Sequence, residues 1–335
     1  MRTRHREYYF RLAAQAASKL EGGEAGEWLD RVEAEYENVR AALEWSLASG
    51  AVREAMQAAV HLNALWVARN MLFEAMQWNS RIRAAYLDDD VLKLTVLIQA
   101  VSEARMSDDP AQVRVYLQQA RALAETLDDK HSMADVLKET ALYERARGND
   151  EQALELLEQA VQLFCEVHSI GQIEALYWMA HIRLQRGELE ESRRHWEEGL
   201  VEARKLETSW YIGWGLGGLS MQARYEGDLK QATALSRESL SVKWQYQDKA
   251  GLAYSLEELA MIATDERKLE RAARLWGAAE QYRETIHAVV PPIVRAEYDS
   301  HIARAALDAT AFERAWAEGR TMSIEQALAY AAQDD

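Results

Sequence analysis

Side chains that commonly bind ligands recur in successive sets through the middle of this chain. Aromatic rings offer contact area to a bound molecule, while lysine, arginine, histidine and glutamate fix its orientation through charge and hydrogen bonds. Placed on one face, such residues would bind a peptide, a partner helix or a small molecule without covalent chemistry. The candidate binding residues are Lys138, Arg145, Glu174, Tyr177, His181, Trp214, Met221, Arg224, Tyr254 and Glu257, with Asp135 and Met261 at equivalent positions.

Nucleotide-binding loops are missing or misplaced in this sequence. No stretch follows the pattern G-x-x-x-x-G-K-[ST], whose backbone amides and lysine hold the phosphates of a nucleotide. The stretch GWGLGG (213–218) superficially resembles a dinucleotide-binding loop, but such a loop follows a strand and opens a helix. These glycines fall inside a helical pattern, so we interpret them as sites of close helix packing. We therefore predict no cofactor in this chain.

Residues that perform covalent or metal chemistry are also scattered. The histidines show no H-E-x-x-H or other metal-ligand spacing. The single cysteine, Cys165, excludes an internal disulfide and a cysteine-rich metal site, and its apolar neighbours in LFCEV predict a small core residue. Carboxylates are abundant, but no two stand out as an acid pair across a cleft. We predict that the chain is not an enzyme and holds no metal.

Charge and hydropathy narrow the possible partners. The formal net charge of −16 argues against general nucleic-acid binding, because phosphate contacts need a basic surface. No segment reaches the roughly 20 apolar residues needed to cross a bilayer. The N-terminal stretch MRTRHREYYF does not have the features of a signal peptide. We expect a cytoplasmic protein without direct nucleic-acid binding or membrane contact.

The elements that must position the candidate residues are helices. Ala, Leu, Glu, Gln and Arg, which are all good helix formers, dominate the composition. Prolines occur only at positions 110, 291 and 292, and no run of alternating β-branched residues indicates a strand. The predicted fold class is all-α.

One helix junction recurs along the chain at intervals of 38 to 40 residues. A large apolar residue usually stands eleven positions before it, and small residues stand seven before, five after and twelve after. Small residues let two antiparallel helices approach closely, and one such pair cannot bury its apolar faces alone. Stacked pairs must therefore share a continuous core. The junctions fall at Asn70, Asp108, Gly148, Gly187, Gly227 and Arg267.

From residue 50 to 290 this pattern resembles the tetratricopeptide repeat, in which a Leu-x-x-x-small helix, a tight turn and a second helix follow one another. The interval exceeds the usual repeat of about 34 residues because the second helix runs on where a proline would normally stop it. The resemblance implies a right-handed α-solenoid of about six antiparallel helix pairs. It also implies that the first helices line a concave groove, and the groove positions select the candidate binding residues. Trp196 and Trp276, at equivalent positions on second helices, are expected to fill the seams.

Both ends depart from the repeat and are predicted as helical caps. Residues 27–47 form an amphipathic pattern that predicts one helix, after a first helix over roughly 3–20. Near the other end a helix is expected after Pro291 and Pro292. Two short helices follow it, the second capped by Ser323. The predicted domains are an N-terminal cap over 1–49, a repeat array over 50–290 and a C-terminal cap over 291–335.

Four segments resemble the C-terminal sensor halves of large bacterial STAND-type regulators: HREYYFRLA, WLDRVEAEYENVRAALEWSL, RAARLWGAAEQYRE and FERAWAEGRTMSIEQALAYA. Those regulators join an NB-ARC-like ATPase, a winged helix and a tetratricopeptide array, with a LuxR-like or related DNA-binding domain elsewhere in the chain. The resemblance implies that the array receives an inducer or partner and releases an autoinhibited ATPase. The ATPase and DNA-binding domains of the same full-length chain would then be its partners.

The alternative function is a constitutive tetratricopeptide scaffold for protein–protein interaction or self-association. The flanking sequence separates the two, because a sensor would accompany a phosphate-loop ATPase and a helix-turn-helix domain, whereas a stand-alone gene would favour the scaffold.

Overall fold

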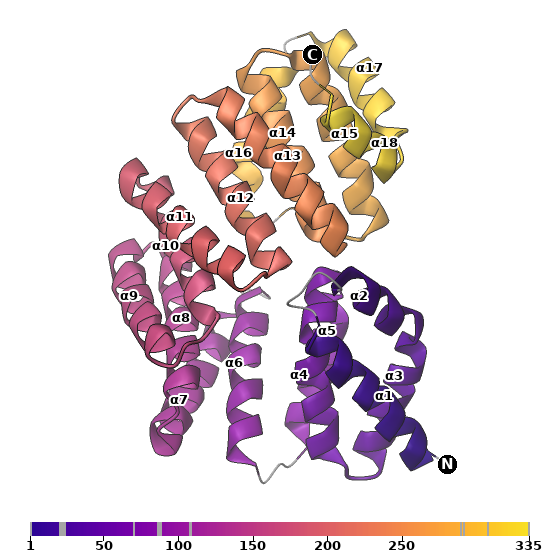
Figure 1. Ribbon diagram of the computed structural model, residues 1–335, viewed down its shortest axis with the longest axis vertical. Helices are drawn as coiled ribbons and strands as arrows, with labels where there is room; N and C mark the ends of the chain where they lie inside the picture. Colours follow the sequence, from indigo (N-terminus) through magenta and orange to yellow (C-terminus); the bar gives the residue numbers. More distant parts are fainter. Residues whose placement is uncertain are drawn as a thin grey trace. The chain divides into compact units, whose positions relative to one another are not determined.

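The computed structural model describes residues 2–19, 25–69, 71–85, 89–106, 109–288, 290, 292–306 and 308–333, and over these residues the regular structure is helical throughout. Figure 1 shows the helices following one another through short connections. The elements are α1 (Arg2–Ala17), α2 (Ala25–Ala34), α3 (Tyr36–Ala48), α4 (Val52–Ala68), α5 (Leu72–Ala84), α6 (Asp90–Met106), α7 (Pro110–Leu127), α8 (Lys130–Ala146), α9 (Asp150–Glu166), α10 (Gly171–Gln185), α11 (Leu189–Lys205), α12 (Ser209–Tyr225), α13 (Leu229–Tyr246), α14 (Lys249–Asp265), α15 (Leu269–Thr285), α16 (Pro292–Ala305), α17 (Ala309–Arg320) and α18 (Ile324–Ala331).

Helices α4 to α15 follow the predicted alternation of first and second helices. Extensive packing joins α6 to α7, α8 to α9, α12 to α13 and α14 to α15. The fold is therefore an all-α, tetratricopeptide-like solenoid, as the repeat predicts. No described helix combines the length and the apolar character that a bilayer crossing requires.

Left-handed backbone forms the turns inside the pairs. Gly148, Gly187 and Gly227 have φ angles of 82°, 76° and 84°. Glycine adopts this conformation without steric penalty because it has no Cβ. Arg267 stands at the equivalent position with φ of 62°, which strains an L-residue. The remaining predicted junctions, which lie outside the described residues, are Asn70 and Asp108.

Small residues lie where the helices of a pair come closest, as the register predicts. Ser192 Oγ donates a hydrogen bond to the carbonyl oxygen of Ala180 at 2.8 Å, and Ser220 Oγ donates to that of Ala232 at 2.9 Å. These buried hydroxyls reach across to the neighbouring backbone, which shows how near the two helices are. The predicted close-contact residues that are at most 1% exposed include Ala141, Ala153, Ala160, Ala180, Ser192, Ser220, Ala232, Ser239, Ala260, Ala272 and Ala279.

The chain forms two compact units. Unit 1 comprises Met1–Val67 and Met71–Glu202, and unit 2 comprises Ala68–Asn70 and Ala203–Asp335. Unit 1 contains one core cluster around Leu94 on α6 and another around Leu157 on α9. Unit 2 has a large cluster that α13, α14 and α15 share with the C-terminal helices.

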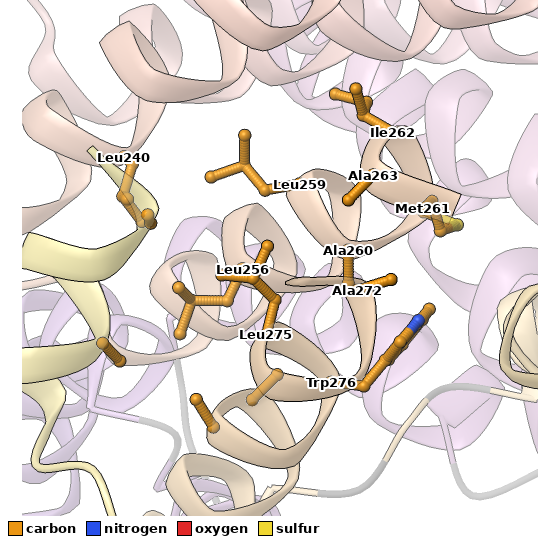
Figure 2. Packing of buried hydrophobic residues seen from close by; sticks show 14 of the residues in the cluster. Leu240, Leu256, Leu259, Ala260, Met261, Ile262, Ala263, Ala272, Leu275 and Trp276 are labelled. Atoms are coloured by element: carbon orange, nitrogen blue, oxygen red, sulfur yellow. The ribbon is translucent and has the colours of Figure 1, made fainter. Parts of the chain in front are cut away.

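Figure 2 shows the centre of the unit 2 core. Leu256 on α14 and Leu275 on α15 lie close together, and Ala260 lies beside Ala272. Both leucines are fully buried, and burying such a side chain contributes about 1.5 to 3 kcal/mol. Trp276 packs against the same core at 3% exposure, so it fills the seam as predicted.

The N-terminal helices differ in one respect from the prediction. The stripe over 27–47 is buried at Leu29, Val39 and Leu43, but the predicted single helix is interrupted at Glu35, which separates α2 from α3. Glu35 has a non-helical backbone with φ of −99° and ψ of 10°. No glycine or proline marks this interruption in the sequence.

The C-terminal helices follow the prediction more closely. Ser323 caps α18, with its Oγ accepting from the backbone N–H of Gln326 at 3.3 Å. Helix α17 crosses α15 at glycines, because a Cβ on Gly277 would lie 2.2 Å from the carbonyl oxygen of Trp316. A Cβ on Gly319 would lie 2.0 Å from the carbonyl oxygen of Arg274. Pro291, the first residue of the double proline at the start of α16, lies outside the described residues.

Candidate ligand-binding face

The predicted binding residues lie on four first helices, α8 and α10 in unit 1 and α12 and α14 in unit 2. In unit 1 the relevant surface is the α8–α10 face, which consists of Asp135, Lys138, Arg145, Glu174, Trp178 and His181.

Lys138 joins α8 to α10. Its ammonium lies 2.8 Å from Glu174 Oε2 and 3.3 Å from Asp135 Oδ1, while the residue is 8% exposed. Burial alone would lower the pKa of Lys138, but the carboxylates of Glu174 and Asp135 outweigh it and raise the pKa well above its ordinary value. The lysine therefore stays charged, and its pairing holds two successive repeats together. Like Arg145 at 9% exposure, it is buried, so the prediction that these two cations are open to a ligand is wrong.

An aromatic stack continues the face along α10. The guanidinium of Arg145 lies 5.2 Å from the ring centroid of Trp178, and its Nη2 donates to Gln185 Oε1 at 3.1 Å. Trp178 Nε1 donates to Glu174 Oε1 at 3.3 Å. Trp178 is also stacked with His181, at a centroid separation of 6.1 Å. Both rings remain partly exposed.

His181 is held neutral in this stack. Burial and then the nearby charge of Arg145 lower the pKa of its imidazole to about 3. Its Nδ1 is buried and makes no hydrogen bond within the described part of the chain. The face thus presents one flat aromatic ring, one neutral imidazole and the partly exposed carboxylates of Asp135 and Glu174.

The prediction that Tyr177 belongs to this surface is wrong. Tyr177 is fully buried and packs against Trp196 on α11, with ring centroids 5.0 Å apart. Gly199 makes the space, since a Cβ there would lie 2.4 Å from Tyr177 Cε1. Tyr177 consequently fills the seam, Leu176 is only half-buried, and Trp178 takes the place on the face that we expected for Tyr177.

In unit 2 two of the predicted residues are covered. Arg224 Nε donates to Glu258 Oε1 at 2.9 Å and its Nη2 donates to Glu297 Oε1 at 2.6 Å. Burial would lower the pKa of Arg224, but Glu258 and Glu297 raise it above its ordinary value. Because Glu297 belongs to α16, the C-terminal cap helix covers this arginine, and the prediction that it is open to a ligand is wrong.

Glu257 is covered in the same way. At 2% exposure it accepts hydrogen bonds from Arg283 Nε at 2.5 Å and Nη2 at 2.8 Å. The hydroxyl of Tyr298 on α16 donates to its Oε2 at 2.8 Å. Glu257 is therefore part of a buried polar network rather than a groove residue. The predicted exposure of Glu257 is also wrong.

Other predicted residues of unit 2 remain partly exposed. Trp214 is stacked with Tyr211 at a centroid separation of 6.3 Å, and Met221 is also half-buried. Tyr254 lies under the guanidinium of Arg283, with 4.7 Å from ring centroid to Cζ. Met261, by contrast, is buried at 4% exposure, so its predicted position in the groove is wrong.

The glycines of GWGLGG serve helix packing, as we interpreted them. The side chain of Lys243 on α13 passes close to them, because a Cβ on Gly213 would lie 3.0 Å from its Cγ. Lys243 Nζ donates to Ser255 Oγ on α14 at 3.1 Å, and burial lowers its pKa. The glycine run therefore accommodates a lysine rather than a phosphate.

One relay of polar groups in unit 1 was not predicted. His131 Nε2 lies 3.1 Å from Ser169 Oγ, and His131 Nδ1 lies 3.4 Å from Asp135 Oδ2. Such a Ser–His–Asp order can activate a hydroxyl in hydrolases. Here Ser169 is 8% exposed and its Oγ also accepts the backbone N–H of Gly171 at 3.1 Å. The bonds tie α8 to the start of α10 and leave the hydroxyl little access to a substrate.

Cys165 also differs from its prediction. The residue is exposed rather than a small core residue, because its position on α9 falls to one side of the buried stripe of Phe164 and Leu157. Its thiol donates to Gln172 Oε1 at 2.9 Å. Partial desolvation and the charge of Glu202 raise the pKa of this thiol, so it is not an activated nucleophile.

Two hollows lie away from the predicted residues. One of about 450 Å³ in unit 1 is lined by Arg6, Phe10 and His61 among others, and one of about 420 Å³ in unit 2 is lined by Leu240, Trp244 and Leu328 among others. Within the described ranges, no group of three or more His, Cys, Asp or Glu residues could hold a metal ion.

Comparison with known sequences gives a partial match. No protein-family model matches the chain. The "Putative HTH-type transcriptional regulator Rv0890c" of Mycobacterium tuberculosis is 28% identical over 181 residues, which cover 40% of this chain and 20% of that protein. Mb0914c of Mycobacterium bovis, which has the same description, matches equally well. The chain thus spans about a fifth of the length of the curated relatives that it matches.

Solved structures share the fold at low sequence identity. A STAND protein with a tetratricopeptide repeat sensor, PH0952 from Pyrococcus horikoshii, aligns over 94% of this chain and 52% of its own, with a TM-score of 0.56 and 13% identity. A Rap protein complexed with Competence and Sporulation Factor aligns over 97% and 99%, with a TM-score of 0.56 and 15% identity. These likenesses establish a shared tetratricopeptide-like architecture.

Proposed function

We propose that this chain is the non-enzymatic sensor region of a bacterial STAND-type transcription regulator, and that its α8–α10 face binds an inducer or partner. The arrangement of that face carries the proposal. Lys138 and Arg145 are engaged by their neighbours, while the rings of Trp178 and His181 stay partly exposed beside the carboxylates of Asp135 and Glu174. A flat ring flanked by fixed polar groups can recognise a peptide or a small molecule.

The comparisons support this proposal from two directions. The mycobacterial relatives are described as transcriptional regulators, and PH0952 is described as a STAND protein whose sensor has the tetratricopeptide architecture. The Rap structure holds a bound factor on a similar architecture. We therefore extend the proposal to ATPase and DNA-binding domains in the same full-length chain as partners, with no direct nucleic-acid contact by this region. Caps over 1–49 and 291–335 around an array over 50–290 are part of the same proposal.

Trp214, Met221 and Tyr254 form a second proposed binding surface, separate from the α8–α10 face. They lie in unit 2 and are partly exposed on α12 and α14. Ligand binding by these three residues is a prediction separate from that of the α8–α10 face.

A thermal-shift screen with peptides and small metabolites tests the proposal, because a ligand of the folded state raises the melting temperature. The shift caused by a hit should be lost in Trp178→Ala. It should persist in Trp28→Ala, a matched control whose ring also stacks with an arginine, at 4.9 Å from Arg31 Cζ, on α2. Equal shifts in both variants would rule out the α8–α10 face as the site.

The reading frame around the gene tests the regulator assignment. A phosphate-loop ATPase and a helix-turn-helix domain in the same frame are expected. A stand-alone frame would favour the constitutive scaffold instead.

A further inference from the structure

Helix α16 occupies a face of unit 2 through polar side chains. Glu297 supplies a carboxylate to Arg224 on α12, where Nη2 and Oε1 are 2.6 Å apart. Arg224 also holds Glu258 on α14, so one guanidinium joins three helices. Figure 1 shows α16 beside α14 and α12 in this unit.

Three further residues of α16 make polar contacts: Tyr298 directly after Glu297, His301 one turn along and Arg304 two turns along. Tyr298 donates its hydroxyl to Glu257, which Arg283 on α15 already holds through two hydrogen bonds. Arg304 Nη2 lies 2.7 Å from Asp265 Oδ1 on α14, and His301 Nε2 lies 3.6 Å from the same oxygen. Glu297, Tyr298, His301 and Arg304 are spaced i, i+1, i+4 and i+7, so they form one stripe of the helix.

Between residues 295 and 305, most side chains of α16 stay at least partly exposed. Among its side chains from residue 295 to 305, those that are buried are Tyr298, His301 and Ala305. By contrast, α14 is buried along nearly its whole length from Gly251 to Thr264. Tyr298, Ala305 and the partly buried Ile302 join the unit 2 core, but the other side chains of this stretch are exposed or make polar contacts. A helix that is less buried than its neighbours opens at a lower free energy than the core helices around it.

We propose that the face formed by α12, α14 and α15 is a helix-binding site, that α16 is its built-in occupant, and that a partner helix displaces it. The fitting partner is an amphipathic helix that presents a carboxylate, a tyrosine and a cationic residue with the spacing of Glu297, Tyr298 and Arg304. This site lies within unit 2 and is independent of the α8–α10 face.

The chemistry of the site explains why the exchange needs a matching helix. Departure of α16 takes Glu297 from the buried Arg224 and the Tyr298 hydroxyl from the buried Glu257. Leaving buried polar groups without partners is costly. A partner that restores a carboxylate and a hydroxyl at the same places avoids this cost, whereas a purely apolar helix does not.

Hydrogen exchange on the wild-type chain tests whether α16 opens by itself. Amides of α16 are expected to show protection factors at least tenfold lower than those of α14 and α15, with an opening that leaves α14 and α15 protected. Equal protection across the three helices would overturn the proposal. This measurement does not depend on any variant folding correctly.

A binding experiment tests recognition. The probe is a fluorescent peptide of residues 292–306, PIVRAEYDSHIARAA. It should bind the Glu297→Gln/Tyr298→Phe double variant at least tenfold more tightly than wild type, because the variant weakens the built-in helix and leaves the receiving face unchanged. Circular dichroism confirms that the variant is folded.

The control peptide carries the same two changes, Glu297→Gln and Tyr298→Phe, and should bind the double variant at least tenfold more weakly than the unchanged peptide. Equal affinity of the two peptides, or equal affinity of the unchanged peptide for wild type and variant, would overturn the proposal. The proposal would also be overturned if the chain were a dimer and the peptide bound only after dilution into monomers. In that case α16 of a second copy would occupy the face.

Discussion

Two tryptophans show how differently the same residue type is used in unit 1. Trp196 is 1% exposed and packs on Tyr177 in the seam between α10 and α11, whereas Trp178 is partly exposed on the α8–α10 face. Trp196→Ala should reduce the free energy of unfolding by about 3 to 5 kcal/mol, because a large buried ring leaves a cavity. Trp178→Ala should cost clearly less. Urea denaturation of both variants measures this, and the reverse order would contradict the assignment of seam and face.

His181 should make stability depend on pH. Its folded-state pKa of about 3 lies below the ordinary value of 6.5, so the unfolded chain binds the proton more readily. The stabilisation is present above pH 6.5 and is lost as the pH falls toward the folded pKa. The loss of unfolding free energy reaches about 2 kcal/mol at pH 5. His181→Asn should therefore lose less stability than wild type between pH 7 and pH 5 in urea denaturation. The same loss in both proteins would show that this imidazole is not shielded.

The individual side chains were the least predictable part of the molecule. The repeat register placed Trp196 and Trp276 correctly in seams, but it placed Tyr177 on the wrong face. Gly199 offered a signal, since sister repeats carry Ala160 and Ser239 at that position and have no room for a ring. The periodicity of a helix fixes a direction to within about one residue, so neighbours such as Tyr177 and Trp178 can exchange roles when a glycine opens space.

At the scale of the helical elements, Arg267 adopts a left-handed backbone conformation that is unfavourable for a residue with a Cβ. It adopts φ of 62° at the turn where three sister repeats have glycine. Arg267→Gly should raise the free energy of unfolding by about 0.5 to 1 kcal/mol, because glycine adopts left-handed backbone without penalty. The reciprocal change, Gly227→Arg, should lower it. Thermal denaturation of both variants checks this, and a destabilised Arg267→Gly would mean that its side chain contributes more than its backbone costs.

Close packing of the helix pairs gives a prediction of opposite sign. Ala180 and Ala260 are fully buried where two helices meet, so Ala180→Leu and Ala260→Leu should each cost about 1 to 3 kcal/mol through overpacking. Ala122→Leu on the exposed side of α7 is the control and should change stability by less than about 0.5 kcal/mol. Chemical denaturation measures all three. If the two buried variants matched the control, the register of small residues would be wrong.

The elements themselves were predicted well because each carries a local signal. Glycines ended helices, Ser323 began α18, and small residues marked the helix contacts. The interruption at Glu35 was missed because glutamate favours helices and no turn residue accompanies it. A break that tertiary packing imposes leaves no trace in the local sequence.

At the scale of the whole chain, repetition made the fold predictable, because stacked copies have one way to bury their apolar faces. The packing of α16 against α12 and α14 was not predictable. It depends on single pairings such as Arg224 with Glu297, which are separated by 73 positions and belong to no repeat. Consequently the sequence did not indicate which residues of the first helices the chain itself covers.

The measurement that tests the central claim most directly is hydroxyl-radical footprinting of the chain with the first ligand from the thermal-shift screen. Our account predicts that the ligand reduces oxidation of Trp178 and His181 on α10, while Trp28 on α2 reacts as before. Protection of the exposed sides of α9 and α11, with Trp178 still fully reactive, would contradict the claim that the α8–α10 face is the sensor surface.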